Sequence, residues 1–202
     1  LASIREETGV TLSDLNLGGG YGVRYTQEDE AINIPARLAE LAAHLKEETE
    51  RLGLPMPRFL MEPGRSIVAD AGMTLYTVGS VKRIPGYKQY AAVDGGMTDN
   101  PRYALYQSRY TVYHAHKSGS MERFDVVGRC CESGDIIQPG VELPGDTCRG
   151  DILAVCTTGA YNYSMASNYN RLPRPAVVML TPDRIYEAVR RETFADLTAL
   201  DL

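Results

Sequence analysis

The stretch from Arg129 to Asp135, RCCESGD, places two adjacent cysteines directly before a carboxylate. The chain's cysteines form no CxxC pair and have no histidine at ligand spacing, which disfavours a zinc site. Four cysteines in 202 residues are not a disulfide framework, and a disulfide between neighbouring cysteines would close a strained ring. We therefore expect reduced thiols and no metal. The pattern alone leaves two readings of the cysteine pair open, buried packing and acid–base chemistry.

Two glycine-containing turns follow strand-like runs. Gly18, Gly19 and Gly20 come after the alternating run at residues 12–17, and Glu62-Pro63-Gly64-Arg65 follows the short apolar run RFLM. Glycines at a strand end let backbone N–H groups approach a phosphate closely. A glycine triplet alone also fits a plain tight turn. The two turns together, at the ends of neighbouring strands, predict a phosphate-sized cradle that also holds a cation and a carboxylate.

Arginine and tyrosine side chains gather in two further segments. DGGMTDNPRYALY contains Arg102 and Tyr106, which could bind a carboxylate through a bidentate fork and a hydroxyl group. The alternative for this segment is a turn with surface polar groups. The segment TTGAYNYSMASNYN crowds Tyr161 and two more tyrosines among small polar residues, which suits a pocket wall as well as an exposed loop.

Residues 1–70 carry the elements that would position the cradle. A helix at residues 4–8, the strand at 12–17, an amphipathic helix in NIPARLAELAAHLKEETERLG and a strand at 59–61 alternate along the chain. Strands that alternate with helices indicate a parallel sheet, and a complete (β/α)8 barrel needs roughly 250 residues. We therefore expect residues 1–70 to hold only the last βα units of such a barrel.

Residues 71–202 change to short runs rich in Tyr and Val, separated by turn residues, with the boundary near 69–74. Such a pattern of short strands predicts a separate antiparallel β-barrel or sandwich of Greek-key type. The predicted fold class is therefore α/β followed by β. Near the end, RIYEAVRRE reads as a strand, and Thr193 with Asp196 forms a capping box for a short helix.

Composition excludes several classes of function. The net charge of -5 comes from interspersed charges with no basic block, so nucleic acid is not an expected partner. No apolar run reaches the roughly 18 residues that a membrane helix needs, and the start resembles no signal peptide, so we expect a cytoplasmic protein. The first residues read as the middle of a larger protein.

Five motifs together carry a family resemblance. LGGGYG, EPGR, DGGM with NPRYALY, CESGD and GAY occur in this order and at spacings that resemble the diaminopimelate decarboxylases, pyridoxal phosphate enzymes of the alanine racemase-like fold. The resemblance spans nearly the whole chain, but only the carboxyl-terminal part of that family's usual length. It implies decarboxylation of meso-diaminopimelate to L-lysine and CO2.

The resemblance assigns cofactor contacts to both glycine turns. Gly18, Gly19, Gly20, Gly64 and Arg65 would hold the phosphate of pyridoxal 5'-phosphate. Glu62 would face its pyridine nitrogen and keep it protonated, which strengthens the cofactor as an electron sink. Tyr161 would contact cofactor and substrate together.

The same matching assigns the substrate contacts and the proton donor. Arg65, Arg102 and Tyr106 would bind the distal end of the diacid diamine, with Glu132 at its distal ammonium; a site that offered only an acid would suit ornithine instead. Cys131 would protonate Cα after CO2 leaves, since an ordinary thiol with a pKa of about 8.5 is mostly protonated at neutral pH. Cys130 falls outside the motif and is assigned to packing. The family's loop reaches into the other subunit, which implies a homodimer with active sites at the interface.

One part of the family pattern is missing. The lysine that forms a Schiff base with the cofactor, and the histidine that stacks on its ring, have no counterpart here, so we expect this chain alone to be inactive. Two alternatives remain. One is a related decarboxylase acting on carboxynorspermidine or arginine, and the other is a non-catalytic module for dimerisation or regulation.

Overall fold

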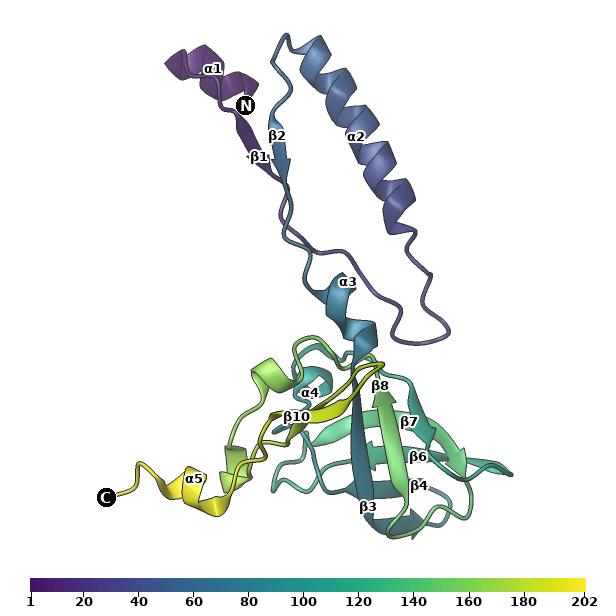
Figure 1. Ribbon diagram of the computed structural model, residues 1–202. Helices are drawn as coiled ribbons and strands as arrows, with labels where there is room; N and C mark the ends of the chain where they lie inside the picture. The colour runs from purple at the N-terminus through teal and green to yellow at the C-terminus, as the bar shows by residue number, and fades with distance from the viewer. The chain divides into compact units, whose positions relative to one another are not determined.

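The computed structural model describes all residues from 1 to 202 and divides into two compact units (Figure 1). Unit 1 comprises residues 1–24 and 28–68, and unit 2 comprises residues 25–27 and 69–202. No helix combines the length and the apolar character needed to span a membrane.

Unit 1 alternates helices with two short strands. The strands pair in parallel with Leu15 opposite Phe59, as the alternation of the sequence predicts, although each is only three residues long. The elements are α1 (Ala2–Thr8), β1 (Asp14–Asn16), α2 (Ile34–Arg51), β2 (Arg58–Leu60) and α3 (Arg65–Val68).

Local signals explain the helix ends of unit 1. Gly9 closes α1 in the left-handed conformation at φ 73° and donates its N–H to Arg5 O at 2.9 Å. Asn33 caps α2 by accepting the Ala36 N–H at 3.1 Å, and Pro35 occupies the first turn, where its missing N–H costs no helical hydrogen bond. On one face of α2 the leucines at positions 38, 41 and 45 are half-buried, as expected of the amphipathic helix, whereas Leu52 follows the helix and is exposed.

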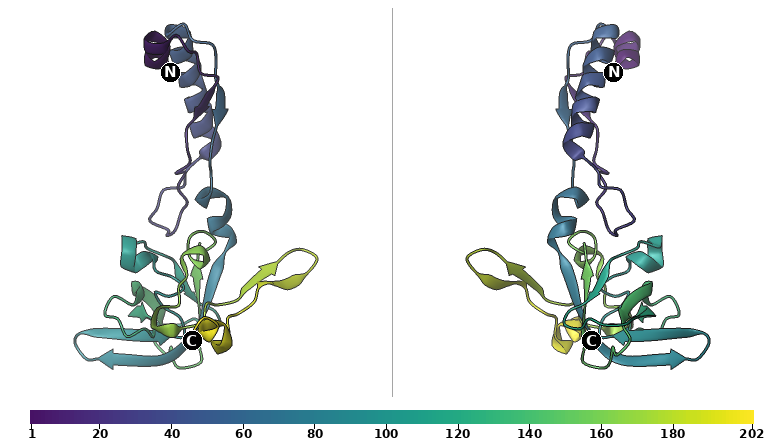
Figure 2. Two further views of the ribbon diagram at one scale, coloured as in Figure 1. Left: turned by 90° about the vertical axis from the view of Figure 1, so that its left-hand side faces the viewer. Right: turned by 90° about the vertical axis from the view of Figure 1, so that its right-hand side faces the viewer.

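Unit 2 is built on a six-stranded sheet. Its strands and short helices are β3 (Met73–Ile84), β4 (Lys88–Val93), α4 (Arg102–Tyr106), β5 (Val112–His114), β6 (Met121–Val127), β7 (Ile136–Pro144) and β8 (Ile152–Cys156). The strand order is β5-β8-β3-β4-β6-β7. The two edge strands β5 and β7 contact each other, so that the sheet curls almost into a barrel (Figure 2).

The expectation of a purely antiparallel domain is wrong at one pair of strands. β4 and β6 run parallel, with Ala91 opposite Val126, whereas the remaining pairs of the six-stranded sheet are antiparallel. Local periodicity fixes which residues form a strand but not the direction of its neighbour, because α4 and β5 intervene between these two strands. The sheet is therefore mixed.

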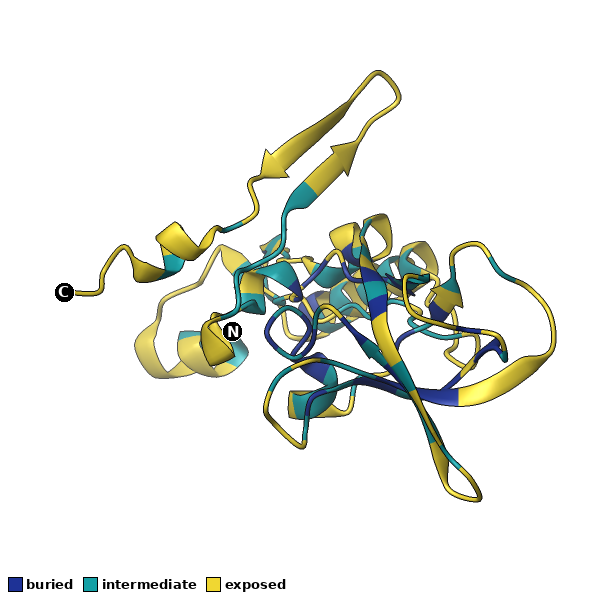
Figure 3. Ribbon diagram, turned by 90° about the horizontal axis from the view of Figure 1, so that it is seen from below, coloured by how far each residue is buried: buried dark blue, intermediate teal, exposed yellow.

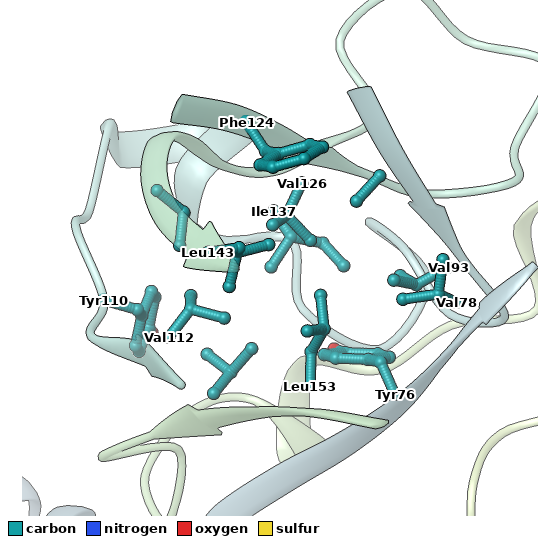
Figure 4. Close-up of a cluster of buried hydrophobic side chains, with 13 residues drawn as sticks. Tyr76, Val78, Val93, Tyr110, Val112, Phe124, Val126, Ile137, Leu143 and Leu153 are labelled. Carbon is teal, nitrogen blue, oxygen red and sulfur yellow. The ribbon is translucent and has the colours of Figure 1, made fainter. Parts of the chain in front are cut away.

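The core of unit 2 fills the inside of this curled sheet (Figure 4). Phe124, Ile137, Leu143 and Leu153 are its largest fully buried hydrophobic side chains. In β8 the burial alternates along the strand, so that Leu153 and Val155 face inward. Tyr25 joins this unit because its ring packs edge-on against Tyr110, with the ring centroids 5.2 Å apart.

The end of the chain forms a separate hairpin and a short helix. β9 (Val177–Leu180) and β10 (Ile185–Val189) pair only with each other, and most of their residues are exposed (Figure 3). α5 (Phe194–Thr198) begins at the predicted capping box, in which Thr193 and Asp196 each accept the other's N–H. The strand and the helix predicted here from the sequence are thus confirmed.

Candidate functional site

The carboxyl ends of β1 and β2 bring the two glycine-containing turns together in unit 1. The backbone bonds them directly, since Leu17 N donates to Leu60 O at 2.9 Å and Glu62 N donates to Gly18 O at 2.8 Å. Parallel neighbours necessarily place both carboxyl ends at one edge. The structure therefore joins the two turns that the sequence places more than forty residues apart, from Gly18 to Glu62.

The glycines in these turns meet specific backbone requirements. Gly18 and Gly20 have φ values of 70° and 89°, in the left-handed region that side chains disfavour. A side chain at Gly19 would overlap with the carbonyl oxygen of Glu62, whereas nothing lies within 4 Å of a Cβ at Gly64. The N–H groups of Gly19, Gly20 and Gly64 find no acceptor in the chain. Free amides beside open space are what an anion-binding cradle requires.

Asn16 links the predicted carboxylate to this cradle. Its Nδ2 donates to Glu62 Oε1 at 2.7 Å, and its Oδ1 accepts the Gly18 N–H at 2.7 Å. Asn16 thus fixes the orientation of Glu62 against the glycine turn. Sequence reasoning missed this residue, although its position as the last residue of the strand before the glycines was a usable signal. Arg65 comes directly after Gly64, at the first position of α3, and is half-buried.

Arg102 is the centre of a second group, in unit 2. Its side chain is buried, at 8% exposure, whereas that of Tyr106 is exposed, so the reading as a turn with surface polar groups fails at Arg102. The guanidinium lies over the rings of Tyr106 and Tyr161, at 5.4 and 5.0 Å from their centroids. Its Nη2 donates to Ser108 Oγ at 3.3 Å, and its Nε has no hydrogen-bond partner. A buried cation with an unused donor is suited to an anionic ligand.

The segment around Tyr161 is strained and anchored. Tyr161 adopts φ 71°, an uncommon value for a residue with a side chain, and its side chain is exposed. The next residue, Asn162, is buried and accepts the Tyr110 hydroxyl at 3.4 Å, while its own Nδ2 is unpaired. Burial raises the pKa of Tyr110, with the Arg102 charge opposing the shift.

Cys131 and Glu132 lie on the exposed loop between β6 and β7. The Cys131 N–H donates to Asn170 Oδ1 at 2.7 Å, which ties this loop to the segment that follows Tyr161. Glu132 Oε1 accepts the Gly134 N–H at 3.1 Å and the Ser133 hydroxyl at 3.3 Å, and these bonds lower the pKa of the carboxyl. A charged carboxylate and an exposed thiol are therefore presented side by side.

The two adjacent thiols differ in their surroundings. Cys130 is partly buried, and burial together with the nearby Asp135 charge raises the pKa of its thiol to about 11. Cys131 is exposed. This contrast agrees with the assignment of Cys130 to packing.

The predicted site residues thus fall on both units. Gly18, Gly19, Gly20, Glu62, Gly64 and Arg65 lie in unit 1, whereas Arg102, Tyr106, Cys131, Glu132 and Tyr161 lie in unit 2. Within unit 2 the structure brings Arg102, Tyr106 and Tyr161 into one cluster. All four cysteines are free, and no group of three or more His, Cys, Asp or Glu side chains could hold a metal ion.

Comparison with known protein families identifies the chain. The family model described as the pyridoxal-dependent decarboxylase, C-terminal sheet domain, matches residues 16–159. The chain belongs to this family. Membership of the pyridoxal-dependent decarboxylases accounts for the sheet-rich unit 2.

Its relatives within the pyridoxal-dependent decarboxylases include diaminopimelate decarboxylases. The diaminopimelate decarboxylase of Bacillus subtilis is 50% identical over 190 residues, covering 93% of this chain and 43% of the relative. The crystal structure of diaminopimelate decarboxylase from M. jannaschii in complex with L-lysine is 34% identical with a TM-score of 0.91, covering 100% of this chain and 45% of that chain. The chain therefore spans less than half the length of these relatives.

A solved structure of lower similarity is named with a different ligand. The crystal structure of lysine/ornithine decarboxylase complexed with cadaverine from Vibrio vulnificus is 27% identical with a TM-score of 0.71, and it covers 83% of this chain. Similarity to the diaminopimelate decarboxylases is thus higher in both sequence and structure.

Proposed function

We propose that this chain is the carboxyl-terminal portion of a diaminopimelate decarboxylase, which converts meso-diaminopimelate to L-lysine and CO2. The observation that carries the proposal is that unit 2 supplies both a buried cation, Arg102, and a loop that presents the charged carboxylate of Glu132. A substrate with an amino acid group at its distal end needs both charges. The relatives with the higher identity support the same reaction.

The cradle of unit 1 fits the phosphate of pyridoxal 5'-phosphate. The unused N–H groups of Gly19, Gly20 and Gly64 would donate to phosphate oxygens, Gly18 would allow the turn, and Arg65 would supply a counter-charge. Glu62, held by Asn16, would bind the protonated ring nitrogen. When bound, the cofactor supplies an electron sink for the pair left at Cα by departing CO2.

The substrate's distal end would be bound by residues of opposite charge. The fork of Arg102, the hydroxyl of Tyr106 and the guanidinium of Arg65 would bind its carboxylate, while Glu132 accepts hydrogen bonds from its ammonium group. Tyr161, whose ring stacks on Arg102, would line the site between cofactor and substrate.

The Cys131 thiol would deliver the proton to Cα. Cys131 is exposed, which is the condition for its thiol to meet a ligand, whereas Cys130 is partly buried. Glu132 beside it would hold the distal ammonium, so that one loop both orients the substrate and protonates it. We further propose that this loop serves the active site of a partner subunit in a homodimer located in the cytoplasm.

Steady-state turnover of the complete enzyme on a panel of substrates tests the proposal. We expect meso-diaminopimelate to be preferred over ornithine, arginine and carboxynorspermidine, which lack the distal amino acid group, by roughly a hundredfold or more in kcat/KM, because a site built for paired polar groups rejects analogues that leave them unpaired. Preference for any of these three amines would refute the assignment of the substrate.

A further inference from the structure

The loop that carries Cys131 makes one of its backbone hydrogen bonds to a distant segment of the chain. Within the loop, Glu132 N donates to Cys130 O at 2.8 Å and Asp135 N donates to Glu132 O at 3.2 Å. The Cys131 N–H instead donates to Asn170 Oδ1 at 2.7 Å, across 39 positions of the chain. This bond holds the backbone of the residue whose thiol is the proposed proton donor.

Asn170 has a backbone conformation that suits few residue types. Its φ is 54° and its ψ is 21°, in the left-handed region, and Arg171 follows with a φ of 57°. Asparagine is one of the few residues with a side chain that are enriched in this region. The turn therefore favours an asparagine at the position where its amide oxygen meets the Cys131 N–H.

The turn that presents Asn170 is itself fixed on both sides by one carboxylate. Glu192 Oε2 accepts Asn168 Nδ2 at 2.6 Å and the Arg174 N–H at 2.8 Å. Asn168 Nδ2 also donates to Leu172 O at 3.0 Å, which closes the turn. Hydrogen bonds to an ionised carboxylate are stronger than those between neutral groups. The acceptor of the Cys131 N–H thus has a fixed place in unit 2.

A second contribution from the same turn reaches the neighbouring carboxylate. The Gly134 N–H is the largest cause of the lowered pKa of Glu132, and Tyr169 adds a smaller one. Tyr169 directly precedes Asn170 in the turn. The turn therefore acts on both residues of the loop that the proposed function uses.

We propose that Asn170 is a positioning residue, whose amide oxygen fixes the Cys131 peptide and with it the placement of the thiol. The inference rests on the proposed function, in which Cys131 delivers the proton to Cα. The bond acts within the loop's own chain and sets no distance to Arg102. It is therefore consistent with a loop that serves the active site of a partner subunit.

Asn170→Gly in the complete enzyme removes the amide oxygen and keeps the turn, because glycine adopts a φ near 54° without strain. We expect kcat on meso-diaminopimelate to fall roughly three- to tenfold, the effect of losing one neutral hydrogen bond. Asn170→Asp keeps an acceptor oxygen and tolerates the same φ, so its kcat should stay within about twofold of the wild type. Wild-type kcat in Asn170→Gly, or equal losses in both variants, would overturn the role.

Asn33→Gly is the matched control. The Asn33 side chain likewise accepts one backbone N–H, that of Ala36 at 3.1 Å, but it caps α2 in unit 1. We expect a small loss of stability and a change in kcat of less than about twofold. A loss of kcat equal to that of Asn170→Gly would mean that any lost bond of this kind has the same effect, and would overturn the role.

A double-mutant cycle separates positioning from a general structural effect. If Asn170 acts through the Cys131 thiol, Asn170→Gly should change kcat by less than about twofold in a Cys131→Ala background. If Asn170 only supports the fold, the same loss should appear in both backgrounds. The second result would overturn the role.

Amide hydrogen exchange at constant pH tests the inference without turnover. Exchange of the Cys131 amide should accelerate in Asn170→Gly and stay unchanged in Asn170→Asp and Asn33→Gly. Unchanged exchange in Asn170→Gly would overturn the inference. A wild-type enzyme that leaves meso-diaminopimelate intact would refute the proposed function alone.

Discussion

Replacement of Arg102 by lysine removes the guanidinium fork while keeping the positive charge. Arg102 is buried, its Nη2 donates to Ser108, and its Nε is unpaired, so part of its donor capacity remains available for a ligand. A lysine ammonium offers a point charge and cannot give two parallel N–H donors to one carboxylate. The variant therefore isolates the contribution of bidentate binding.

The expected magnitude follows from one lost hydrogen bond to a charged group. Such a bond contributes about 1.5 to 3 kcal/mol, and about 1.4 kcal/mol corresponds to a tenfold change. We expect kcat/KM on meso-diaminopimelate to fall roughly 10- to 150-fold. The loss should lie mainly in KM, because the distal carboxylate is bound equally in the ground state and the transition state.

Steady-state release of CO2 by the complete enzyme measures both constants. Arg83→Lys is the matched control, since the Arg83 guanidinium also lies over an aromatic ring, that of Phe124 at 5.5 Å, and donates to Gly145 O at 2.6 Å. It belongs to the sheet and to no predicted site. We expect a small loss of stability and unchanged kinetics in the control.

The reasoning would be refuted by either of two results. Equal losses of kcat/KM in the Arg102 and Arg83 variants would mean that Arg102 acts only through stability. A fall in kcat with unchanged KM in Arg102→Lys would mean that the fork does not hold the distal carboxylate in the ground state.

Two further predictions concern the fold. Phe124→Ala removes a side chain with 0% exposure and should lower the free energy of unfolding, measured by urea titration, by about 3 to 5 kcal/mol. Phe194 is 75% exposed, so Phe194→Ala should change the free energy of unfolding by less than about 0.5 kcal/mol. Comparable changes in the two variants would contradict the assigned core. Hydrogen bonds from the Arg174 side chain and backbone lower the pKa of Glu192 from 4.5 to about 2, so its stabilising contribution is complete above pH 4.5 and is lost as the pH falls through about 2. The protection factor of the Arg174 amide, which is its exchange rate corrected for the intrinsic pH dependence of exchange, should therefore fall as the pH is lowered over this range in the wild type. Glu192→Gln should remove that fall, and a variant profile like that of the wild type would exclude the Arg174–Glu192 pair as its cause.

Local sequence signals predicted most individual elements of this fold. Runs rich in Tyr and Val between turn residues predicted the β-rich character of residues 71–202, and the capping box predicted α5. The strand β7 is not predictable from local signals, because Pro139 and Gly140 lie within it and such residues usually end a strand. Gly140 adopts φ 68° there, and the pairing of β6 with β7 is irregular along its length.

The site was predictable where glycines or charges mark it in the sequence. The two turns at Gly18 and Gly64 were found because they follow strands, and parallel pairing then joins them. The role of Asn16 could not be read in the same way, since it depends on Glu62, which folding brings from 46 positions away. Long-range pairing, including the parallel contact of β4 with β6, is not encoded in local periodicity.

A comparison of Cys131→Ala with Cys130→Ala in the complete enzyme tests the central claim most directly. If Cys131 delivers the proton to Cα, its loss should lower kcat on meso-diaminopimelate by roughly a hundredfold or more, as removal of a general acid does. Cys130→Ala should leave kcat within about threefold of the wild type, because its partly buried thiol contributes packing. Equal losses in the two variants, or full activity without Cys131, would contradict the account.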